Sequence, residues 1–408
     1  MLSVHSCPLG KVGSENTGGM SVYIREFARE LGRRGHWVDV YTRIHEPIHD
    51  QVIKLGQNAR LIHLKAGEEA IQKLAIYDHL GDFAHDVENF TKQKGLQYDL
   101  VHSHYWLSGL TGKRLQQRWN IPHVVGFHTL GAVKNAIGIG EDEPELRINA
   151  ERELVKDCQR IIASTAKGKE DLITYYGATP EAIRVIPCGV NLDLFRPIER
   201  AMARSHLGLD GESIILFVGR IVRLKGIDNL LKAMTYLERK QTIKLVVIGG
   251  DENSQAELQK LKRLARTLRI QESVTFLGLV EQERLPFFYS AADLCVVPSY
   301  YESFGLVLLE SLACGTPVVA TRVGGAESVI RPGETGYVVI DNHPSHLADK
   351  IALFLSTSNG NREFVGSIRA SVSKYSWSNI TDAIIEEYQS VLRDFHVKPS
   401  EGIQEFRT

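Results

Sequence analysis

Short runs of β-branched residues alternate with longer amphipathic segments along this chain of 408 residues. Such alternation is typical of parallel β-sheets flanked by helices. In the first half it predicts strands at Leu2–Val4, Val38–Tyr41, Leu61–Leu64, Leu100–His102, Val124–Phe127, Arg160–Ala163 and Arg184–Ile186. The pattern restarts in the second half with SIILFVGR, KLVVIGG, SVTFLG, DLCVVPS, TPVVATRVGG and TGYVVI. The sequence therefore predicts an α/β chain with two Rossmann-like doubly wound sheets.

A loop-like passage, CGVNLDLFRPIERAMARSHLGLDGE, separates the two halves. We expect a first domain at residues 1–196, a second at 197–378, a C-terminal helix at 379–397 that packs back on the first domain, and a flexible tail at 398–408. Ligands of open α/β sheets bind beyond the carboxyl ends of the strands, so two facing domains predict a cleft between them. The opening MLSVHS resembles the end of a strand, which suggests a start codon placed a few residues late or a trimmed N-terminus.

Composition disfavours several classes of protein. Hydrophobic residues make up 43% of the chain, charged residues 24%, and the formal net charge is −1, which gives no global electrostatic case for binding nucleic acid or an anionic membrane. The five cysteines are scattered and never spaced as CxxC, which fits a reducing cytosol and disfavours a disulfide framework or a structural zinc. No apolar run reaches the roughly 18–20 residues of a membrane span, and no signal peptide opens the chain. We therefore expect a cytoplasmic protein without stable membrane insertion.

A glycine pair ends the first loop, in GSENTGGMSVYIREFARELGRRGH. Gly18 and Gly19 precede an amphipathic helix, and glycines at a helix N-terminus let an anion approach the backbone N–H groups. A tight strand-to-helix turn explains the pair equally well. The GxGxxG fingerprint of dinucleotide binding is missing.

Two cations follow the first strand of the second half, in FVGRIVRLKGIDNLLKA. Arg220 and Lys225 stand in the loop before a helix, where they could neutralise a diphosphate, Arg by its fork and Lys as a point charge. Solvated loop cations are the alternative. No Asp-x-Asp pair exists in the chain to hold Mg²⁺ for a diphosphate, which favours the functional interpretation.

The stretch PSYYESFGLVLLE holds two glutamates, Glu302 and Glu310, around an apolar run. Gly305 precedes a predicted helix, and the N–H groups of Leu306 and Val307 at its start can bind a phosphate. Glu310 follows one turn later, where its carboxylate can accept both hydroxyls of a ribose. Glu302 can contact a sugar beyond the phosphates. A helix with a salt-bridged glutamate is the alternative, and it explains neither Gly305 nor the second carboxylate.

Three stretches, TGGMSVY, GRIVRLKG and PSYYESFGLVLLESLACGTPVVATRVGG, together resemble the family-4 retaining glycosyltransferases of the GT-B fold, and the resemblance covers essentially the whole chain in order. It implies that Arg220 and Lys225 bind the donor diphosphate. It also implies that Glu310 holds the donor ribose and Glu302 contacts the transferred sugar. The full set of donor-binding residues is expected to be Gly19, Arg220, Lys225, Val280, Gly305, Leu306, Val307 and Glu310.

The first half is then expected to hold the acceptor. Within the family, the chain is similar to a branch that transfers N-acetylglucosamine to inositol 3-phosphate, the first step of mycothiol synthesis, and to the sucrose-phosphate synthases, which transfer glucose to fructose 6-phosphate. Both branches hold a phosphorylated acceptor with cations of the first domain. GGM, HTLGAVKN and YESFG favour the inositol-phosphate branch, whereas Ser21 stands where both branches carry Asn. The equivalent acceptor residues here are Ser21, Lys73, Tyr105, Thr129, Lys134 and Arg147.

Histidines end two predicted strands of the first half. His102 and His104 project on one side of a strand, which is compatible with a metal, although no third ligand is spaced to join them. His128 by itself is typical of a packed core histidine, but in the family the matching histidine contacts the donor sugar. We therefore expect no metal and no required cofactor, with a UDP-sugar as co-substrate.

The predicted reaction is transfer of a sugar from UDP-glucose or UDP-N-acetylglucosamine to a small phosphorylated acceptor such as inositol phosphate, with retention at the anomeric carbon. Arg220, Lys225, Glu302 and His128 are the expected catalytic residues. Fructose 6-phosphate, a neutral sugar or a glycan are alternative acceptors. A nicotinamide dehydrogenase or sugar epimerase and a non-catalytic sugar-nucleotide-binding module are the alternatives of other classes. The expected partners are the sugar donor and acceptor, with homodimer formation left open.

Overall fold

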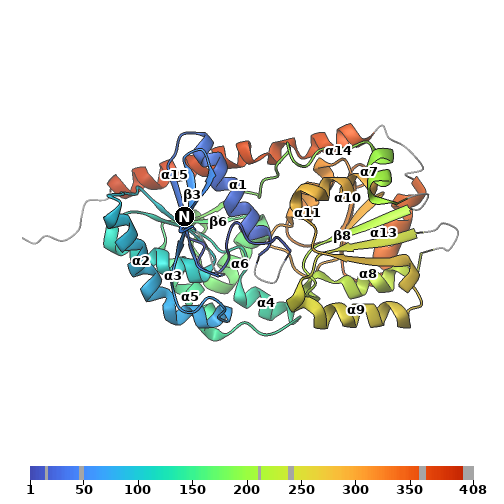
Figure 1. Cartoon of the computed structure of the whole chain (residues 1–408), viewed down its shortest axis with the longest axis horizontal. Coiled ribbons are helices and arrows are strands. Elements are labelled where there is room, and N and C mark those ends of the chain that lie inside the picture. The colour runs from blue at the N-terminus through green and yellow to red at the C-terminus, as the bar shows by residue number, and fades with distance from the viewer. Residues whose placement is uncertain (14–16, 46–49, 210–212, 238–242, 358–363, 398–408) are drawn as a thin grey trace, which may run out of the picture.

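The computed structural model describes residues 1–13, 17–45, 50–209, 213–237, 243–357 and 364–397. Two helix-covered sheets lie side by side, the first half of the chain in one lobe and most of the second half in the other (Figure 1). This arrangement confirms the predicted α/β class with two Rossmann-like sheets. The domain boundaries stay predictions, and the predicted tail at 398–408 lies outside the described residues.

The strands of the first half form two hydrogen-bonded groups, β1-β3-β2 and β4-β5-β6-β7, and only the pairing of β2 with β3 is antiparallel. Leu2 makes isolated parallel bridges to Tyr41 on one side and Ser103 on the other, so it joins the two groups. The strands are β1 (Val38–Arg43), β2 (Val52–Gly56), β3 (Ala59–Leu64), β4 (Val101–His104), β5 (His123–Gly126), β6 (Arg160–Ala163) and β7 (Ile183–Val185).

Two details of this sheet differ from the sequence prediction. Leu2–Val4 was predicted as a strand, yet only Leu2 bridges its neighbours; its N–H donates to His102 O at 2.9 Å. Backbone hydrogen bonds nevertheless tie this segment to β1, where Ser3 N–H donates to Tyr41 O at 2.9 Å. Strand β2 was not predicted, because its side chains are mostly exposed or half-buried and it pairs on one side only, so it carries no continuous apolar run.

The second sheet has the strand order β10-β9-β8-β11-β12-β13, and all its strands are parallel. This is a doubly wound order: β9 and β10 extend the sheet on one side of β8, and β11, β12 and β13 extend it on the other. The strand order therefore reverses between β8 and β11, and ligands of such sheets bind at this switch point. The strands are β8 (Ser213–Val218), β9 (Ile243–Ile248), β10 (Val274–Gly278), β11 (Leu294–Val297), β12 (Val318–Thr321) and β13 (Gly336–Val339).

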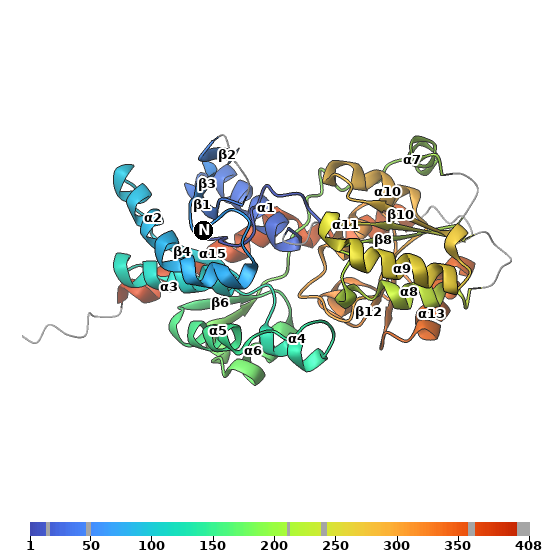
Figure 2. The same ribbon diagram turned by 60° about the horizontal axis from the view of Figure 1, so that its bottom comes forward.

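Helices cover both sheets (Figures 1 and 2). Those of the first half are α1 (Gly19–Arg33), α2 (Leu80–Gln93), α3 (Trp106–Trp119), α4 (Gly131–Ile137), α5 (Glu145–Asp157) and α6 (Ala166–Tyr176). The second half contributes α7 (Arg200–Leu207), α8 (Ile227–Met234), α9 (Gln255–Thr267), α10 (Leu285–Ala291), α11 (Leu306–Ala313), α12 (Ala326–Val329), α13 (Pro344–Thr357), α14 (Val365–Ser371) and α15 (Trp377–Val397).

Helix α15 crosses from the second lobe to the first and lies along α1 (Figure 1). Its Asp382 forms an ion pair with Arg34, and its Glu387 carboxylate lies 3.1 Å from Nε of Arg160. Tyr388 reaches the first sheet, where its hydroxyl lies 2.5 Å from Nδ1 of His102. The chain therefore returns to its first half after completing the second sheet.

Three clusters of buried apolar residues hold the molecule together. One belongs to the first half and contains Phe83 and Trp106, and another belongs to the second half and contains Leu230 and Leu245. The remaining cluster spans both halves and includes Phe27 of α1. The two sheets are thus joined by a shared apolar core as well as by the connecting chain.

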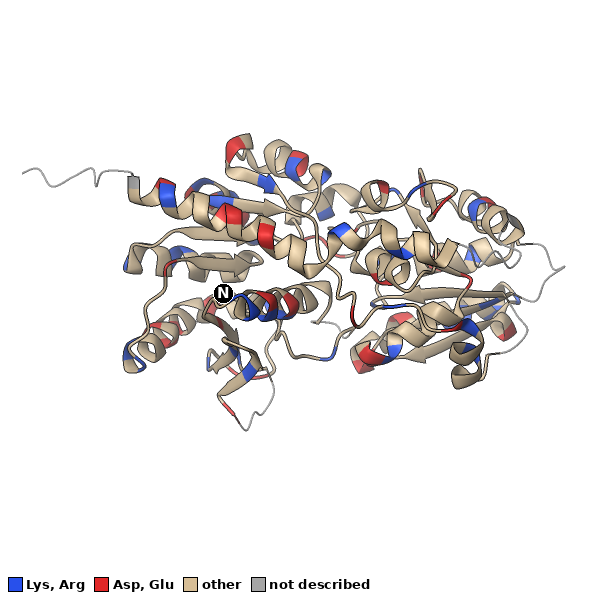
Figure 3. Ribbon diagram, turned by 90° about the horizontal axis from the view of Figure 1, so that it is seen from above, with Lys and Arg blue, Asp and Glu red and all other residues tan. Residues whose placement is uncertain are grey.

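Charged residues of both signs are interspersed over both lobes (Figure 3). The described part of the chain contains no helix that is long and apolar enough to cross a membrane. All five cysteines are free thiols.

Candidate active site

The glycine loop of the first half meets the second half. Gly18 caps the N-terminus of α1 without a side-chain hydrogen bond. A Cβ atom on Gly18 would lie 3.8 Å from Nε of Arg220, and one on Gly19 would lie 3.5 Å from Cδ1 of Leu306. The N-terminus of α1 therefore faces the predicted phosphate-binding elements of the second sheet.

Arg220 and Lys225 follow β8, and Glu302 follows β11, so all three lie at the switch point of the second sheet. Nζ of Lys225 lies 2.5 Å from Oε1 of Glu302, and Ser299 Oγ donates to the same oxygen at 2.8 Å. The residue predicted to hold the diphosphate and the residue predicted to touch the sugar are thus direct neighbours.

Helix α11 begins beside this ion pair. Its N-cap, Gly305, has φ 95° and offers no side-chain cap, so the first N–H groups of the helix, at Leu306 and Val307, have no capping side chain. A Cβ on Gly305 would stand 3.2 Å from Cδ1 of Leu308, and a left-handed φ disfavours any side chain there. An uncapped helix N-terminus at a switch point suits a phosphate group.

Glu310 lies on α11 and is only 7% exposed. Tyr289 OH donates to its Oε2 at 2.8 Å. Burial raises the pKa of Glu310 to about 7, opposed by hydrogen bonds from Tyr289 and Gln282 and by the charge of Arg25. Val280, in the loop after β10, is half-buried and packs against the apolar cluster that spans both halves.

Two predicted site residues in the first half have strained backbones. His128, which follows β5, has φ 59°, and Tyr105, which follows β4, has φ 77°. A left-handed conformation is uncommon for residues other than glycine, and it clusters at functional sites. Tyr105 N–H donates to Gly126 O at 2.8 Å, so the two strand ends are tied together.

The ring of Tyr105 brings two predicted acceptor cations together. Nζ of Lys73 lies 5.4 Å from the ring centroid and Cζ of Arg147 lies 4.8 Å from it. Although Lys73 as a residue is exposed, desolvation of its ammonium and then repulsion from Arg147 lower its pKa to about 8.

Arg147 is buried and already has several partners. Its Nε lies 2.7 Å from Glu151 Oε1, its Nη1 lies 2.8 Å from Glu143 Oε2, and its Nη2 donates to Thr129 O at 2.9 Å and to Thr129 Oγ1 at 3.0 Å. Glu143 also forms an ion pair with Lys134. Thr129, Lys134 and Arg147 therefore belong to one network in which two carboxylates oppose the cations.

Several members of this region were not singled out from the sequence. The His5 ring packs at a tilt against the Tyr105 ring, with centroids 4.2 Å apart, and Glu143 and Glu151 hold Arg147. Both glutamates lie four residues from Arg147 in the sequence, and this i,i+4 spacing could have predicted the two ion pairs. Ser21, predicted at the acceptor, is fully buried, and its hydroxyl lies 2.6 Å from that of Ser6.

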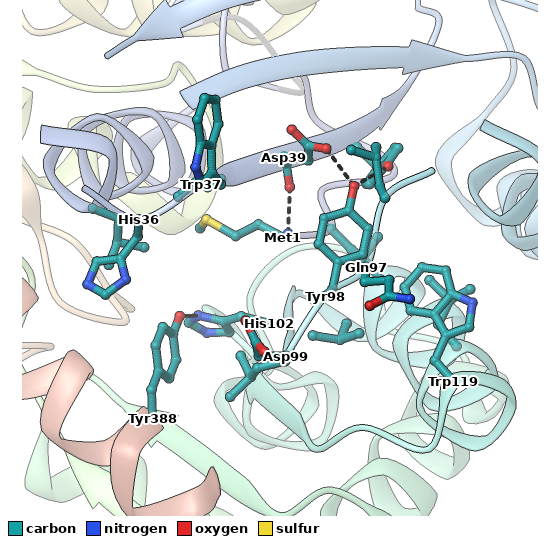
Figure 4. Close-up of a pocket in the computed structure, with 18 of the residues that line it drawn as sticks. Met1, His36, Trp37, Asp39, Gln97, Tyr98, Asp99, His102, Trp119 and Tyr388 are labelled. Atoms are coloured by element: carbon teal, nitrogen blue, oxygen red, sulfur yellow. Dashed lines mark hydrogen bonds between the residues drawn. The ribbon is translucent and has the colours of Figure 1, made fainter. Parts of the chain in front are cut away.

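A cavity of about 630 Å³ lies elsewhere, at the amino ends of β1 and β4 (Figure 4). Its lining includes Trp37, Tyr98 and Tyr388, and the amino group of Met1 donates to Asp39 O at 2.7 Å beside it. None of the predicted site residues lines this cavity. Among the described residues, no group of three or more His, Cys, Asp or Glu side chains is arranged to hold a metal ion, and independence from metal stays a prediction.

Two doubly wound sheets whose strand ends present a glycine loop, two cations and an uncapped helix N-terminus are the arrangement expected of a GT-B glycosyltransferase. The model of Glycosyltransferase Family 4 matches residues 17–194, and that of Glycosyl transferases group 1 matches residues 199–370. The chain belongs to the family-4 glycosyltransferases, as its sequence motifs predicted.

Named relatives agree with this assignment. The D-inositol 3-phosphate glycosyltransferase of Corynebacterium jeikeium (strain K411) is 40% identical over 403 residues, with 96% of each chain covered. That of Mycobacterium leprae (strain Br4923) is 40% identical, with 97% of this chain and 94% of the relative covered.

Solved structures agree as well. The sucrose-phosphate synthase (tll1590) of Thermosynechococcus elongatus is 34% identical, with a TM-score of 0.88 and coverage of 96% of this chain and 98% of the other. Anabaena Alr3699/HepE, solved in complex with UDP and glucose, has a TM-score of 0.76 at 18% identity, covers 95% of this chain and 98% of its own, and shows likeness of fold alone.

Proposed function

We propose that this glycosyltransferase moves glucose or N-acetylglucosamine from a UDP-sugar to a small phosphorylated acceptor, with inositol phosphate as the first candidate, and that the anomeric configuration is retained. The observation that carries the proposal is the meeting of Lys73 and Arg147 on the ring of Tyr105, at the strand ends of the first sheet. An aromatic ring flanked by two cations fits a sugar or cyclitol that bears a phosphate.

On the donor side, the diphosphate would lie between Arg220, Lys225 and the N-terminus of α11. These groups supply positive charge where the leaving UDP develops negative charge. Glu310 would accept the ribose hydroxyls, with Tyr289 holding its second oxygen in place. Glu302 would contact the transferred sugar, and His128 would contact it from the first half.

In the proposed reaction, the bond between the anomeric carbon and the β-phosphate oxygen breaks while the acceptor oxygen forms a new bond on the same face of the sugar. The acceptor hydroxyl gives its proton to the departing phosphate oxygen, so UDP is the leaving group and the general base. The transition state resembles an oxocarbenium ion. The protein acts by orientation and by stabilising charge, and no covalent sugar–enzyme intermediate is required.

Inositol phosphate is supported by relatives at 40% identity that carry that name. Fructose 6-phosphate is the second candidate, supported by a solved sucrose-phosphate synthase at 34% identity. Both acceptors combine hydroxyls with a phosphate and would use the same pair of cations.

The deciding experiment incubates the protein with UDP- and GDP-sugars against inositol phosphate, fructose 6-phosphate and their unphosphorylated forms, with products identified by mass spectrometry. A phosphorylated glycoside formed from a UDP-sugar supports the proposal. Product formed only from unphosphorylated acceptors, or only from GDP-sugars, would overturn it.

A further inference from the structure

Three histidine rings meet where β4 and β5 end. His102 and His104 lie on one face of β4, and their ring centroids are 4.3 Å apart. Nδ1 of His104 lies 3.0 Å from Nε2 of His128. The third ring, that of His102, forms a hydrogen bond through Nδ1 with the hydroxyl of Tyr388 on α15 (Figure 4).

Gly126, the last residue of β5, lies against all three rings. A Cβ atom there would lie 3.6 Å from His102 Nε2, 3.6 Å from His104 Nδ1 and 3.7 Å from His128 Nε2. Tyr23 packs edge-on against the rings of His104 and His128, with centroids 5.7 and 5.2 Å away. The ring planes of this pair are therefore restrained from several sides.

Each histidine of the pair has one ring nitrogen engaged and one left over. His104 is fully buried, and its Nε2 has no partner. His128 is half-buried, and its Nδ1 has no hydrogen-bond partner among the residues that the structure describes. Desolvation lowers the pKa of both rings, that of His128 to about 4, so each is neutral near pH 7 and carries one ring proton.

The shared hydrogen bond then has two arrangements. If His128 donates, the remaining proton of His104 is a buried N–H without an acceptor. If His104 donates from Nδ1, its buried Nε2 is an unpaired acceptor and the proton of His128 lies on Nδ1. Among backbone groups, orphaned buried N–H donors are rarer than under-satisfied acceptors, and the same preference applied to the ring nitrogens favours the second arrangement.

We propose that His104 is a positioning residue that fixes His128 as the Nδ1–H tautomer, so that His128 offers an N–H donor to a hydroxyl of the donor sugar. The inference rests on the proposed contact of His128 with that sugar. His104 itself touches neither donor nor acceptor; it acts through the ring that it holds.

The first test needs no substrate. Long-range ¹H–¹⁵N NMR of the full chain labelled on histidine, with the His128 signals assigned through His128→Gln, reports which nitrogen carries the proton. We expect a protonated Nδ1 and an unprotonated Nε2. A protonated Nε2 in the unaltered protein would overturn the proposal.

The second test uses a matched pair of variants. Asn and Leu have the same branched shape, but only the Asn amide can donate in place of Nδ1. His104→Leu should weaken binding of the UDP-sugar about tenfold, the size of one hydrogen bond, while the affinity for UDP alone stays the same; His104→Asn should restore sugar binding. His123→Leu is the control, because His123, the first residue of β5, is also fully buried and its Nε2 lies 2.7 Å from Ser103 Oγ of β4.

The outcomes separate the inference from the proposed function. If the unaltered protein binds neither UDP nor a UDP-sugar, the proposed function fails, and the tautomer measurement alone decides the role of His104. If His104→Leu and His123→Leu change UDP-sugar binding equally, or His104→Leu changes UDP and UDP-sugar equally, His104 is only a structural residue and the inference is wrong.

Discussion

Lys225 and Glu302 form an ion pair across the switch point of the second sheet, with Nζ 2.5 Å from Oε1. Their side chains are 18% and 13% exposed, so the pair is largely shielded from solvent. A donor phosphate that approaches Lys225 must share it with the Glu302 carboxylate. Binding of the diphosphate by Lys225 and contact of Glu302 with the sugar are therefore expected to depend on each other.

Lys225→Ala should slow transfer from the UDP-sugar at least tenfold, because a charge-assisted contact to the leaving diphosphate contributes about 1.5–3 kcal/mol. Steady-state kinetics with the best donor measures the effect. Lys232→Ala is the control, since Lys232 pairs with Asp228 on the surface of α8. Full activity in Lys225→Ala would contradict the assignment.

Glu310→Gln should weaken UDP binding about tenfold, because the amide keeps the shape of the carboxylate but not the charge that strengthens two ribose hydrogen bonds. Isothermal titration calorimetry measures this. Since burial raises the pKa of Glu310 to about 7, UDP affinity of the unaltered protein should rise as pH increases through 7, and this rise should be missing in Glu310→Gln. Unchanged UDP binding in the variant would show that Glu310 serves the fold alone.

The same group predicts a stability profile. The pKa of Glu310 is about 7 in the folded protein and 4.5 in an ordinary setting, so the folded state retains a proton that the unfolded state loses between these values. The stability from this group is fully present below pH 4.5 and is lost as pH rises through 7. Urea denaturation should therefore show a smaller loss of stability between pH 5 and pH 8 for Glu310→Gln than for the unaltered protein. If the stability of the two proteins changed equally with pH, Glu310 would not have the raised pKa.

Lys73→Ala should lower kcat/KM for a phosphorylated acceptor by roughly ten- to a hundredfold and leave an unphosphorylated acceptor nearly unaffected, because only the former loses a charge-assisted bond. The pKa of Lys73 is lowered to about 8, so the preference for phosphate should fall as pH rises through 8 and persist in Lys73→Arg. Lys54→Ala, at an exposed position of β2, is the control. Equal use of both acceptors by the unaltered protein would exclude this role.

Arg147→Ala should lower the free energy of unfolding by about 3–5 kcal/mol, because removing one partner of a buried ion pair leaves the others uncompensated. Glu151 is fully buried against Arg147. Denaturant titration measures the change, and Arg152→Ala on the exposed face of α5 should change it little. Unchanged stability of Arg147→Ala would contradict this structural role. Because Arg147 is also proposed to contact the acceptor phosphate, a variant that still folds should lose its preference for the phosphorylated acceptor as well.

EDTA should leave transfer activity intact, because Arg220, Lys225 and the N-terminus of α11 are proposed to supply the positive charge that Mg²⁺ supplies elsewhere. Product formation with and without the chelator measures this. Loss of activity that Mg²⁺ restores would reject metal-independent transfer.

Most strands were predictable because the information lies in short runs. A strand buried on both faces needs a continuous apolar stretch, and β11 and β12, whose every residue is buried, appear as such stretches in the sequence. Strand β2 was missed because an exposed edge strand needs no such run. Leu2 was predicted within a strand, but its pairing depends on tertiary structure, because β1 and β4 must lie on either side of it.

The sequence by itself determined the local units of the site. Gly305, the helix N-terminus after it and Glu310 one turn later lie within a few residues, so helix geometry alone sets their relation. Only the tertiary structure decided which distant groups join them. It brings Tyr289 to Glu310, Lys73 to Tyr105 and His104 to His128.

The tertiary structure also decided how much charge the acceptor cations offer. The sequence predicted Lys134 and Arg147 as two phosphate-binding cations. In the structure, Glu143 pairs with both, and Glu151 also pairs with Arg147. The sequence states which charges are present. The field at a site depends on the distances between those charges and on their burial, and these are set by the packing of segments far apart in the chain.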